Sequence, residues 1–344
     1  MCFGKKAIGL DIADRSIEVA LVKSSWGKYR VASLGRVVLE EGIVEGGRIK
    51  NQDKLIEAVT RVFKEAKSKA ITGGEIVFGL PERQVYTHYF NLPIHNRKDR
   101  EKLILEELIN NLPISEKNIT YSYRIKKESK DGVEVLAVAA AKEVVSEWTQ
   151  FFKKIKLSVN TFDVEVLAIA RDLFDQTPAQ PVLVVDIGSR TSLLAIFDAD
   201  GLCYEQVVAR AGDAITTAIA TATEIDNNKA EVEKIKSGLK SRNKDIVSTI
   251  QKELDVISAE IKDTVAYFEK NTGKKISSAV FVGGTSQLIG LIEYFSDQLK
   301  LPVSIGVSQL NKQKSPLEYI EAIGLALRAL DSSWRTKDPE IKIN

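Results

Sequence analysis

The chain has 344 residues, with 49 Lys and Arg against 47 Asp and Glu, and a hydrophobic fraction of 44%. This length exceeds the size at which one hydrophobic core usually keeps growing, so two lobes are expected. The net charge of +2 gives no electrostatic footprint for nucleic acid, and the composition excludes a disordered or collagen-like chain.

The two cysteines, Cys2 and Cys203, show neither CxxC nor metal-ligand spacing, which indicates a reducing, cytoplasmic compartment. The first residues enter a strand pattern without the apolar core of a signal peptide. No run approaches the roughly 18 apolar residues of a spanning helix. We therefore expect a cytoplasmic protein without direct membrane insertion, which reaches the inner face of a membrane through partners.

An internal repeat organises the chain. GLDIADRSIEVALV (9–22) is in register with VDIGSRTSLLAIF (185–197), so that Asp11 pairs with Asp186 and Ser16 with Thr191 without a gap. A second echo links IVFGLPERQ (76–84) to AVFVGGTSQ (279–287). Two copies of one α/β unit are expected, each a mixed sheet flanked by helices.

In chain order, the first copy predicts strands around 9–22, 31–39 and 75–80 and a helix over 51–70. An insertion follows, with a strand over 84–91, a helix over 98–111 and a hairpin of 119–126 with 133–141. The second copy predicts strands over 183–186, 192–198, 202–209 and 279–282. The expected domains are 1–82 and 143–180 as first-lobe core, 83–142 as its inserted subdomain, 181–225 and 275–334 as second-lobe core, 226–274 as its helical insertion, and 335–344 as a tail.

The segment Asp186-Ile187-Gly188-Ser189-Arg190-Thr191 suits the capture of a phosphate and its metal ion. Backbone NH groups of such a turn can face phosphate oxygens, hydroxyls add donors, and the carboxylate can hold Mg²⁺ through its waters. The same residues also suit a plain turn between two strands. The paired loop at Asp11 favours the phosphate site, because two lobes would then present two carboxylates to one ligand.

A third segment, FVGGTSQLIGL (281–291), predicts a strand, two glycines and a helix start rich in hydroxyls. Gly283 and Gly284 allow a flat ligand to approach the backbone, and Thr285 can cap the helix. A strand-to-helix turn that needs a positive φ explains the same residues.

The order of these three segments resembles the actin-like ATPase superfamily, which includes actin, the heat-shock ATPases, sugar kinases and the cell-division protein FtsA. Within it, the segments LPERQVYTHYFNLP (80–93), ELINNLP (107–113), DVEVLAIARDL (163–173) and IGLALRAL (323–330) resemble the PilM family of type IV pilus assembly proteins. The resemblance implies a two-lobed actin-like fold of duplicated mixed-sheet lobes, with an insertion of the FtsA type in the first lobe.

The resemblance also implies ATP and Mg²⁺ as ligands and a PilN-like membrane protein as partner, bound through its N-terminal cytoplasmic peptide. Carried onto this chain, Asp11 and Asp186 would flank Mg²⁺, and Glu165 is the nearest candidate to polarise a hydrolytic water. The other implied nucleotide contacts are Ser16, Gly188, Ser189 and Thr191 near the phosphates, Gly283, Gly284 and Thr285 by the adenosine, and Glu260 and Lys262 on the ribose side.

Two departures from the family pattern concern catalysis. Ala13 replaces a glycine, and Glu18 stands where relatives commonly carry lysine. Since a carboxylate repels a triphosphate, either Glu18 points elsewhere or the site is altered. We expect an ATP-binding scaffold that is at most a slow ATPase.

The alternatives are an FtsA-like filament-forming protein and a small-molecule kinase of the same superfamily. Self-association is also open, because the tail Ile341-Lys342-Ile343-Asn344 resembles the Ile-Asn start of a PilN-type peptide.

Overall fold

The computed structural model describes residues 4–93, 99–112, 114–130, 132–310, 317–331 and 338–341. The chain divides into two compact units. The first unit comprises Met1–Asp175 and Ser308–Asn344, and the second comprises Gln176–Val307. The expected division placed residues 308–334 in the second core. The structure groups them with the first unit, because helix α9 (Ile320–Leu330) packs against strands β1, β2 and β6 there.

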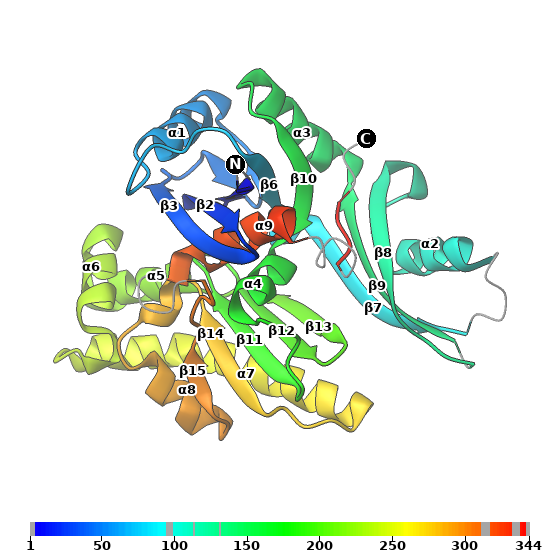
Figure 1. Cartoon of the computed structure of the whole chain (residues 1–344). Coiled ribbons are helices and arrows are strands. Elements are labelled where there is room, and N and C mark those ends of the chain that lie inside the picture. Colours follow the sequence, from blue (N-terminus) through cyan, green and yellow to red (C-terminus); the bar gives the residue numbers. More distant parts are fainter. Residues whose placement is uncertain are drawn as a thin grey trace. The chain divides into compact units, whose positions relative to one another are not determined.

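The main sheet of the first unit has the strand order β10-β6-β1-β2-β3 (Figure 1). Strand β1 pairs antiparallel with β2 and parallel with β6, so the sheet is mixed as expected. The bounds of its strands are β1 Lys6–Ile12, β2 Ser16–Ser25, β3 Lys28–Val38, β6 Glu75–Leu80 and β10 Val159–Val164, and a small ribbon joins β4 Val44–Glu45 to β5 Arg48–Ile49. The helices are α1 Gln52–Lys64, α3 Lys142–Lys154, α4 Glu165–Leu173 and α9.

The two faces of this sheet carry different side chains, because successive residues of a strand point to opposite faces. On one face, Phe78 of β6 packs its ring against Trp148 and Phe152 of α3 at centroid distances of 4.9 Å. On the other face, β1 has Gly9, where an added Cβ would lie 1.8 Å from the carbonyl oxygen of Ala322. Helix α9 therefore lies directly on the backbone of β1.

Helix α4 approaches α9 equally closely. A Cβ at Gly324 of α9 would lie 1.8 Å from the carbonyl oxygen of Ala168 in α4. Both helices are apolar over most of their surface and buried almost throughout. The pair forms the layer that covers the β1 face of the sheet.

A separate three-stranded sheet with the order β7-β9-β8 follows β6 in the chain. Its strands are β7 Val85–Leu92, β8 Ile119–Glu128 and β9 Val133–Ala141, and its helix is α2 Arg100–Asn111. Phe90, Val135 and Ala137 form its core with Ile104 and Leu108 of α2. The strand, helix and hairpin expected within residues 83–142 are therefore all present.

The end of the described chain docks on the first unit. The Ile341 amide donates to the carbonyl of Phe162 at 3.0 Å, beside β10. The Asp338 carboxylate lies 3.0 Å from Nε of Arg171, whose Nη1 is 2.7 Å from the buried Asp163. Residues 342–344 of the predicted tail motif lie outside the described residues, and Ile341 binds within its own chain.

The second unit repeats the first in its strand connections, with the order β13-β12-β11-β14-β15. Its strands are β11 Val182–Ile187, β12 Ser192–Asp198, β13 Gly201–Val208, β14 Ser278–Val282 and β15 Val303–Ile305, and its helices are α5 Gly212–Thr223, α6 Asn227–Ser237, α7 Lys244–Thr272 and α8 Leu291–Leu299. Strand β11 pairs antiparallel with β12 and parallel with β14, as β1 does with β2 and β6. The shared pattern explains the internal repeat.

Candidate functional site

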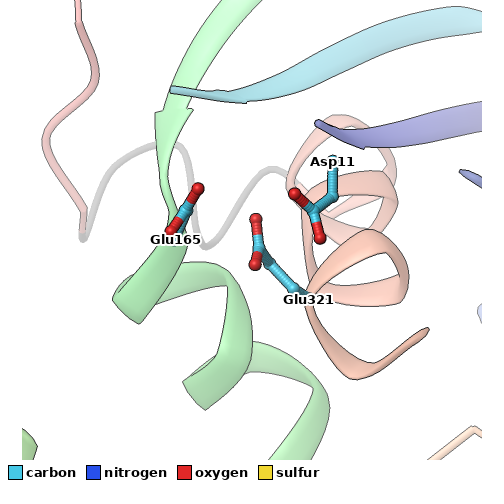
Figure 2. A group of neighbouring side chains, drawn as sticks. All are labelled: Asp11, Glu165 and Glu321. Carbon is cyan, nitrogen blue, oxygen red and sulfur yellow. The ribbon is translucent and has the colours of Figure 1, made fainter. Parts of the chain in front are cut away.

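Three carboxylates from distant parts of the sequence meet in the first unit (Figure 2). Asp11 lies near the end of β1, Glu165 begins α4, and Glu321 lies in the first turn of α9. One carboxylate oxygen of each residue lies within 4.8 Å of those of the other two. The structure thus brings the predicted Asp11 and Glu165 together and adds Glu321 to them.

Gly79 of β6 makes the space for this carboxylate group. A Cβ at Gly79 would lie 2.6 Å from Oε1 of Glu321 and 3.6 Å from Cγ of Glu165. Both glutamates lie in the first turn of their helices, where the helix dipole favours negative charge. A group of three carboxylates offers the oxygen ligands that a hard divalent cation such as Mg²⁺ prefers.

Glu321 was missed from sequence because it stands in the apolar run Tyr319-Ile320-Glu321-Ala322-Ile323. One signal was available: a charged residue inside a helix whose other positions are nearly all apolar is costly to bury unless it has a role. Its proximity to Asp11 depends on how α9 packs, and no local motif encodes that packing.

Glu18 points to a basic partner. It is the cross-strand partner of Asp11, and its Oε1 lies 2.6 Å from Nε of Arg36 on β3. The hydroxyl of Ser16 donates to Oε2 of Glu18 at 3.1 Å. Burial raises the pKa of Glu18 to about 7, against the lowering effect of Arg36 and Ser16. Glu18 therefore has its own cation, and the predicted phosphate contact Ser16 is hydrogen-bonded to it.

In the second unit, the turn between β11 and β12 is held by backbone hydrogen bonds. The Gly188 amide donates to the Thr191 carbonyl at 3.1 Å, and the Gly188 carbonyl accepts from the Gly212 amide at 3.2 Å and from the hydroxyl of Thr285 at 2.8 Å. The Asp213 amide donates to the Ser189 carbonyl at 2.7 Å. The predicted segments 186–191 and 283–285 therefore meet, together with the start of α5.

Asp186 lies at the centre of this group. A Cβ at Gly283, whose φ is +83°, would lie 2.0 Å from Oδ1 of Asp186, so only glycine fits there. Among the described residues, that buried oxygen has no hydrogen-bond partner. Burial raises the pKa of Asp186 to about 6. A buried carboxylate oxygen without a hydrogen bond costs stability, which is typical of a group kept for a ligand.

A buried lysine, which the sequence analysis did not select, adjoins the same turn. Nζ of Lys234 on α6 donates to the Gly212 carbonyl at 3.1 Å and to the hydroxyl of Thr216 at 2.8 Å, and it lies 2.6 Å from Oε2 of Glu231. Lysine is seldom buried without a partner. Glu231 and Lys234 are one helical turn apart, and this spacing is the sequence signal from which their ion pair could have been predicted.

The predicted ribose-side residues, both on α7, have hydrogen-bond partners away from this turn. Glu260 accepts from the amide of Gln206 on β13 at 2.9 Å, and Lys262 donates to Gln298 on α8 at 2.9 Å. Their role toward a nucleotide stays a prediction. The same holds for a joint metal site of Asp11 and Asp186, which belong to different units.

The fold of this chain is similar to that of several proteins of known structure. The chain is similar to the protein in a structure described as a "PilM-PilN type IV pilus biogenesis complex", with 21% identity, a TM-score of 0.81, and 94% of this chain and 98% of that chain covered. It is also similar to the ethanolamine utilization protein EutJ from Carboxydothermus hydrogenoformans, with 16% identity, a TM-score of 0.60 and coverage of 95% and 90%. For MreB5 of Spiroplasma citri bound to AMPPNP, the identity is 15%, the TM-score 0.52 and the coverage 96% and 97%.

These likenesses show an actin-like ATPase fold, with mixed-sheet α/β lobes as the sequence predicted. The family model of the type IV pilus assembly protein PilM matches residues 9–330. The chain therefore belongs to the PilM family. No curated protein sequence matches it. Among the described residues, no helix is long and apolar enough to cross a bilayer.

Asp186→Asn should raise the stability of the nucleotide-free protein at neutral pH. The pKa of Asp186 in the folded protein, about 6, lies above the ordinary aspartate pKa of 3.8. Its contribution therefore favours folding most near pH 4 and is lost as the pH rises through about 6. Keeping the carboxylate ionised above that pH costs up to about 3 kcal/mol, and asparagine removes this cost.

Thermal unfolding of both proteins between about pH 4 and pH 8 measures the effect. The gain in unfolding temperature should be present at pH 7.5 and vanish near pH 4. Asp297→Asn, at an exposed position of α8, is the control and should leave the unfolding temperature unchanged at both pH values. A variant that is less stable than the parent at pH 7.5 would contradict the assignment of cost to this carboxylate.

Proposed function

We propose that this protein is an ATP-binding cytoplasmic scaffold of type IV pilus assembly that docks the cytoplasmic tail of a PilN-like inner-membrane protein. The observation that carries the nucleotide part is the buried Oδ1 of Asp186 beside Gly283, for which the described part of the chain supplies no hydrogen-bond partner. Membership of the PilM family and the fold shared with a relative solved with AMPPNP support it.

In this proposal, the turn of Gly188, Ser189 and Thr191 contacts the phosphates, and Gly283, Gly284 and Thr285 contact the adenosine. Apart from the chain neighbours of Gly284, no atom of the described residues lies within 4 Å of the place where its Cβ would be, which supports an approach of the ligand to this backbone. The ammonium of Lys234 is held at the Gly212 carbonyl of the same turn and is paired with the carboxylate of Glu231. Mg²⁺, when bound, neutralises phosphate charge.

Each unit has its own carboxylates that could hold Mg²⁺: Asp186 in the second unit, and the group of Asp11, Glu165 and Glu321 in the first. Carboxylate oxygens are the ligands that this hard ion prefers. Glu165 is then a metal-side group as well as the nearest candidate to orient a water. Its place in a cluster of carboxylates, together with the Glu18–Arg36 ion pair where relatives commonly carry lysine, supports binding with slow turnover.

Asp186→Ala should raise the dissociation constant of Mg-ATP about tenfold or more, equivalent to about 1.4 kcal/mol, because it removes the carboxylate of the turn. Isothermal titration calorimetry measures the constant, and circular dichroism checks the fold. Asp297→Ala, exposed on α8, is the matched control and should bind like the parent. Unchanged affinity in folded Asp186→Ala would rule out this turn as the nucleotide site.

The partner is expected on the inserted sheet of the first unit. Among the described strands, β7 pairs with β9 alone, so its outer edge is open to an added strand, whereas β10 already carries the bridge to Ile341. Tyr86 shares one face of β7 with Phe90, which is buried in the core with α2, and Tyr89 lies on the other face. Both tyrosines are half-buried.

Replacing Tyr86 and Tyr89 together by serine should weaken binding of a synthetic PilN-type tail peptide about tenfold or more, because truncated interface aromatics commonly cost 1 kcal/mol or more. Fluorescence polarisation of the labelled peptide measures the affinity. Tyr267→Ser, which removes a 57% exposed tyrosine from α7, is the control. If the double variant binds the peptide with full affinity and still binds ATP, the partner site lies elsewhere and the nucleotide proposal is unaffected.

A further inference from the structure

The hairpin that joins β2 to β3 ends in an exposed tryptophan. Trp26 is 96% exposed, more than any other large apolar side chain among the described residues. Trp26 and Gly27 both have positive φ, +54° and +73°, which is the geometry of a tight two-residue turn. Position 26 of such a turn favours glycine, asparagine or aspartate, and a tryptophan there gains nothing from packing.

Behind this tip, three cations stand side by side on neighbouring strands. Lys6 of β1 is the direct cross-strand partner of Lys23 on β2, and Lys23 is the partner of Arg30 on β3. Cross-strand partners share one face of a sheet, and like charges placed so are destabilising. The row of cations therefore does not stabilise the fold.

A fourth cation, Lys69, lies close to the same row. Its charge is the largest cause that lowers the pKa of Lys23, and Arg30 and Lys6 add to the effect. Burial of Lys23 lowers its pKa as well. Lys6 donates to the Thr72 carbonyl at 3.0 Å, which fixes one end of the row without neutralising it. We call Trp26 with these four cations the hairpin patch.

We propose that the hairpin patch binds an anionic phospholipid surface, with the indole of Trp26 in the headgroup region and the cations of Lys6, Lys23, Arg30 and Lys69 on lipid phosphates. Tryptophan prefers the boundary between water and lipid, because its ring is apolar and its N–H is polar. Clustered Lys and Arg are attracted to anionic leaflets. The patch thus combines the two features that a peripheral membrane contact needs.

A lipid surface fits this patch better than an acidic protein does. A stable protein interface needs roughly 1,000 Å² with a packed apolar centre. The hairpin patch offers one projecting ring on a convex turn, with charged side chains around it. A fluid headgroup layer can surround such a tip, whereas a folded protein would have to supply a matching pocket.

The protein would touch the lipid directly through this patch. This contact would act together with the expected attachment to the membrane through a partner protein. It also lies away from the carboxylate group of the first unit. Lys23 and Ser16 lie near opposite ends of β2, and Asp11 lies at the far end of β1 from Lys6. Variants in the hairpin patch should therefore leave Mg-ATP affinity unchanged.

Co-sedimentation of the full chain with phosphatidylcholine vesicles, with and without phosphatidylglycerol, tests the proposal at low and high salt. The parent should bind only the anionic vesicles and lose binding in salt. Lys23→Gln with Arg30→Gln should lower the partition constant about tenfold or more. Trp26→Ser should also weaken binding and abolish the blue shift of tryptophan emission on vesicle addition.

Tyr267→Ser and Lys270→Gln, at exposed positions of α7, are the matched controls and should bind like the parent.

The Lys23 and Arg30 double variant should unfold at the same temperature as the parent or higher, since it removes like charges from one face, so loss of binding cannot be loss of fold. Three results would overturn the proposal: a parent that ignores anionic vesicles, equal binding to neutral vesicles, or patch variants that bind as the parent does. Capture of an acidic protein through Trp26 by a parent that ignores vesicles would assign the patch to a protein partner instead.

Discussion

Contacts that only glycine permits decide where the candidate site residues of this protein lie. In the first unit, Gly9 lets α9 rest on the backbone of β1, and Gly324 lets α4 rest on α9. Those two approaches place the first turns of both helices at the end of β1. Gly79 then leaves the volume that the carboxylates of Glu165 and Glu321 occupy beside Asp11. In the second unit, Gly283 allows the strand end of β14 to lie against Asp186.

The same close packing explains the unusual burial of charge. Arg171 and Arg328 are fully buried between the helices and β10, where they surround Asp163 and hold Asp338 from the end of the described chain. These carboxylates have cations at 2.7 to 3.2 Å. Among the described residues, Oδ1 of Asp186 has no hydrogen-bond partner, and burial raises the pKa of this carboxyl. The contrast separates charges that hold the fold together from one whose burial costs stability, which supports its proposed role toward a ligand.

Much of this architecture could be predicted from the sequence, because it is duplicated. The repeat of 9–22 in 185–197 predicted two sheets with the same strand pairings, and the structure has β1-β2-β3 and β11-β12-β13 in that arrangement. The insertion was also predicted in its elements, since its hairpin and helix have local signals. The sequence also predicted that an aspartate turn and a pair of glycines belong to one site. In the structure, Asp186, Gly188 and Gly283 lie close together.

The errors and omissions concern long-range packing. Residues 308–334 were assigned to the second core because they follow it in the chain, and helix α9 crosses back to the first sheet. Glu321 was missed for the same reason, since its partners come from β1 and α4. Lys234 was missed because its position on a charged helix resembles an ordinary solvated face. In each case the deciding fact is a contact between segments far apart in the sequence.

The most direct test of the account is a crystal structure of the full chain grown with Mn²⁺ and a non-hydrolysable ATP analogue, with the metal located by anomalous diffraction. The account predicts phosphate oxygens at the amides of the Gly188 to Thr191 turn, and a manganese peak whose waters or direct ligands include the carboxylate of Asp186. A nucleotide bound away from this turn, or a crystal saturated with the analogue in which Asp186 contacts neither metal nor phosphate, would contradict it.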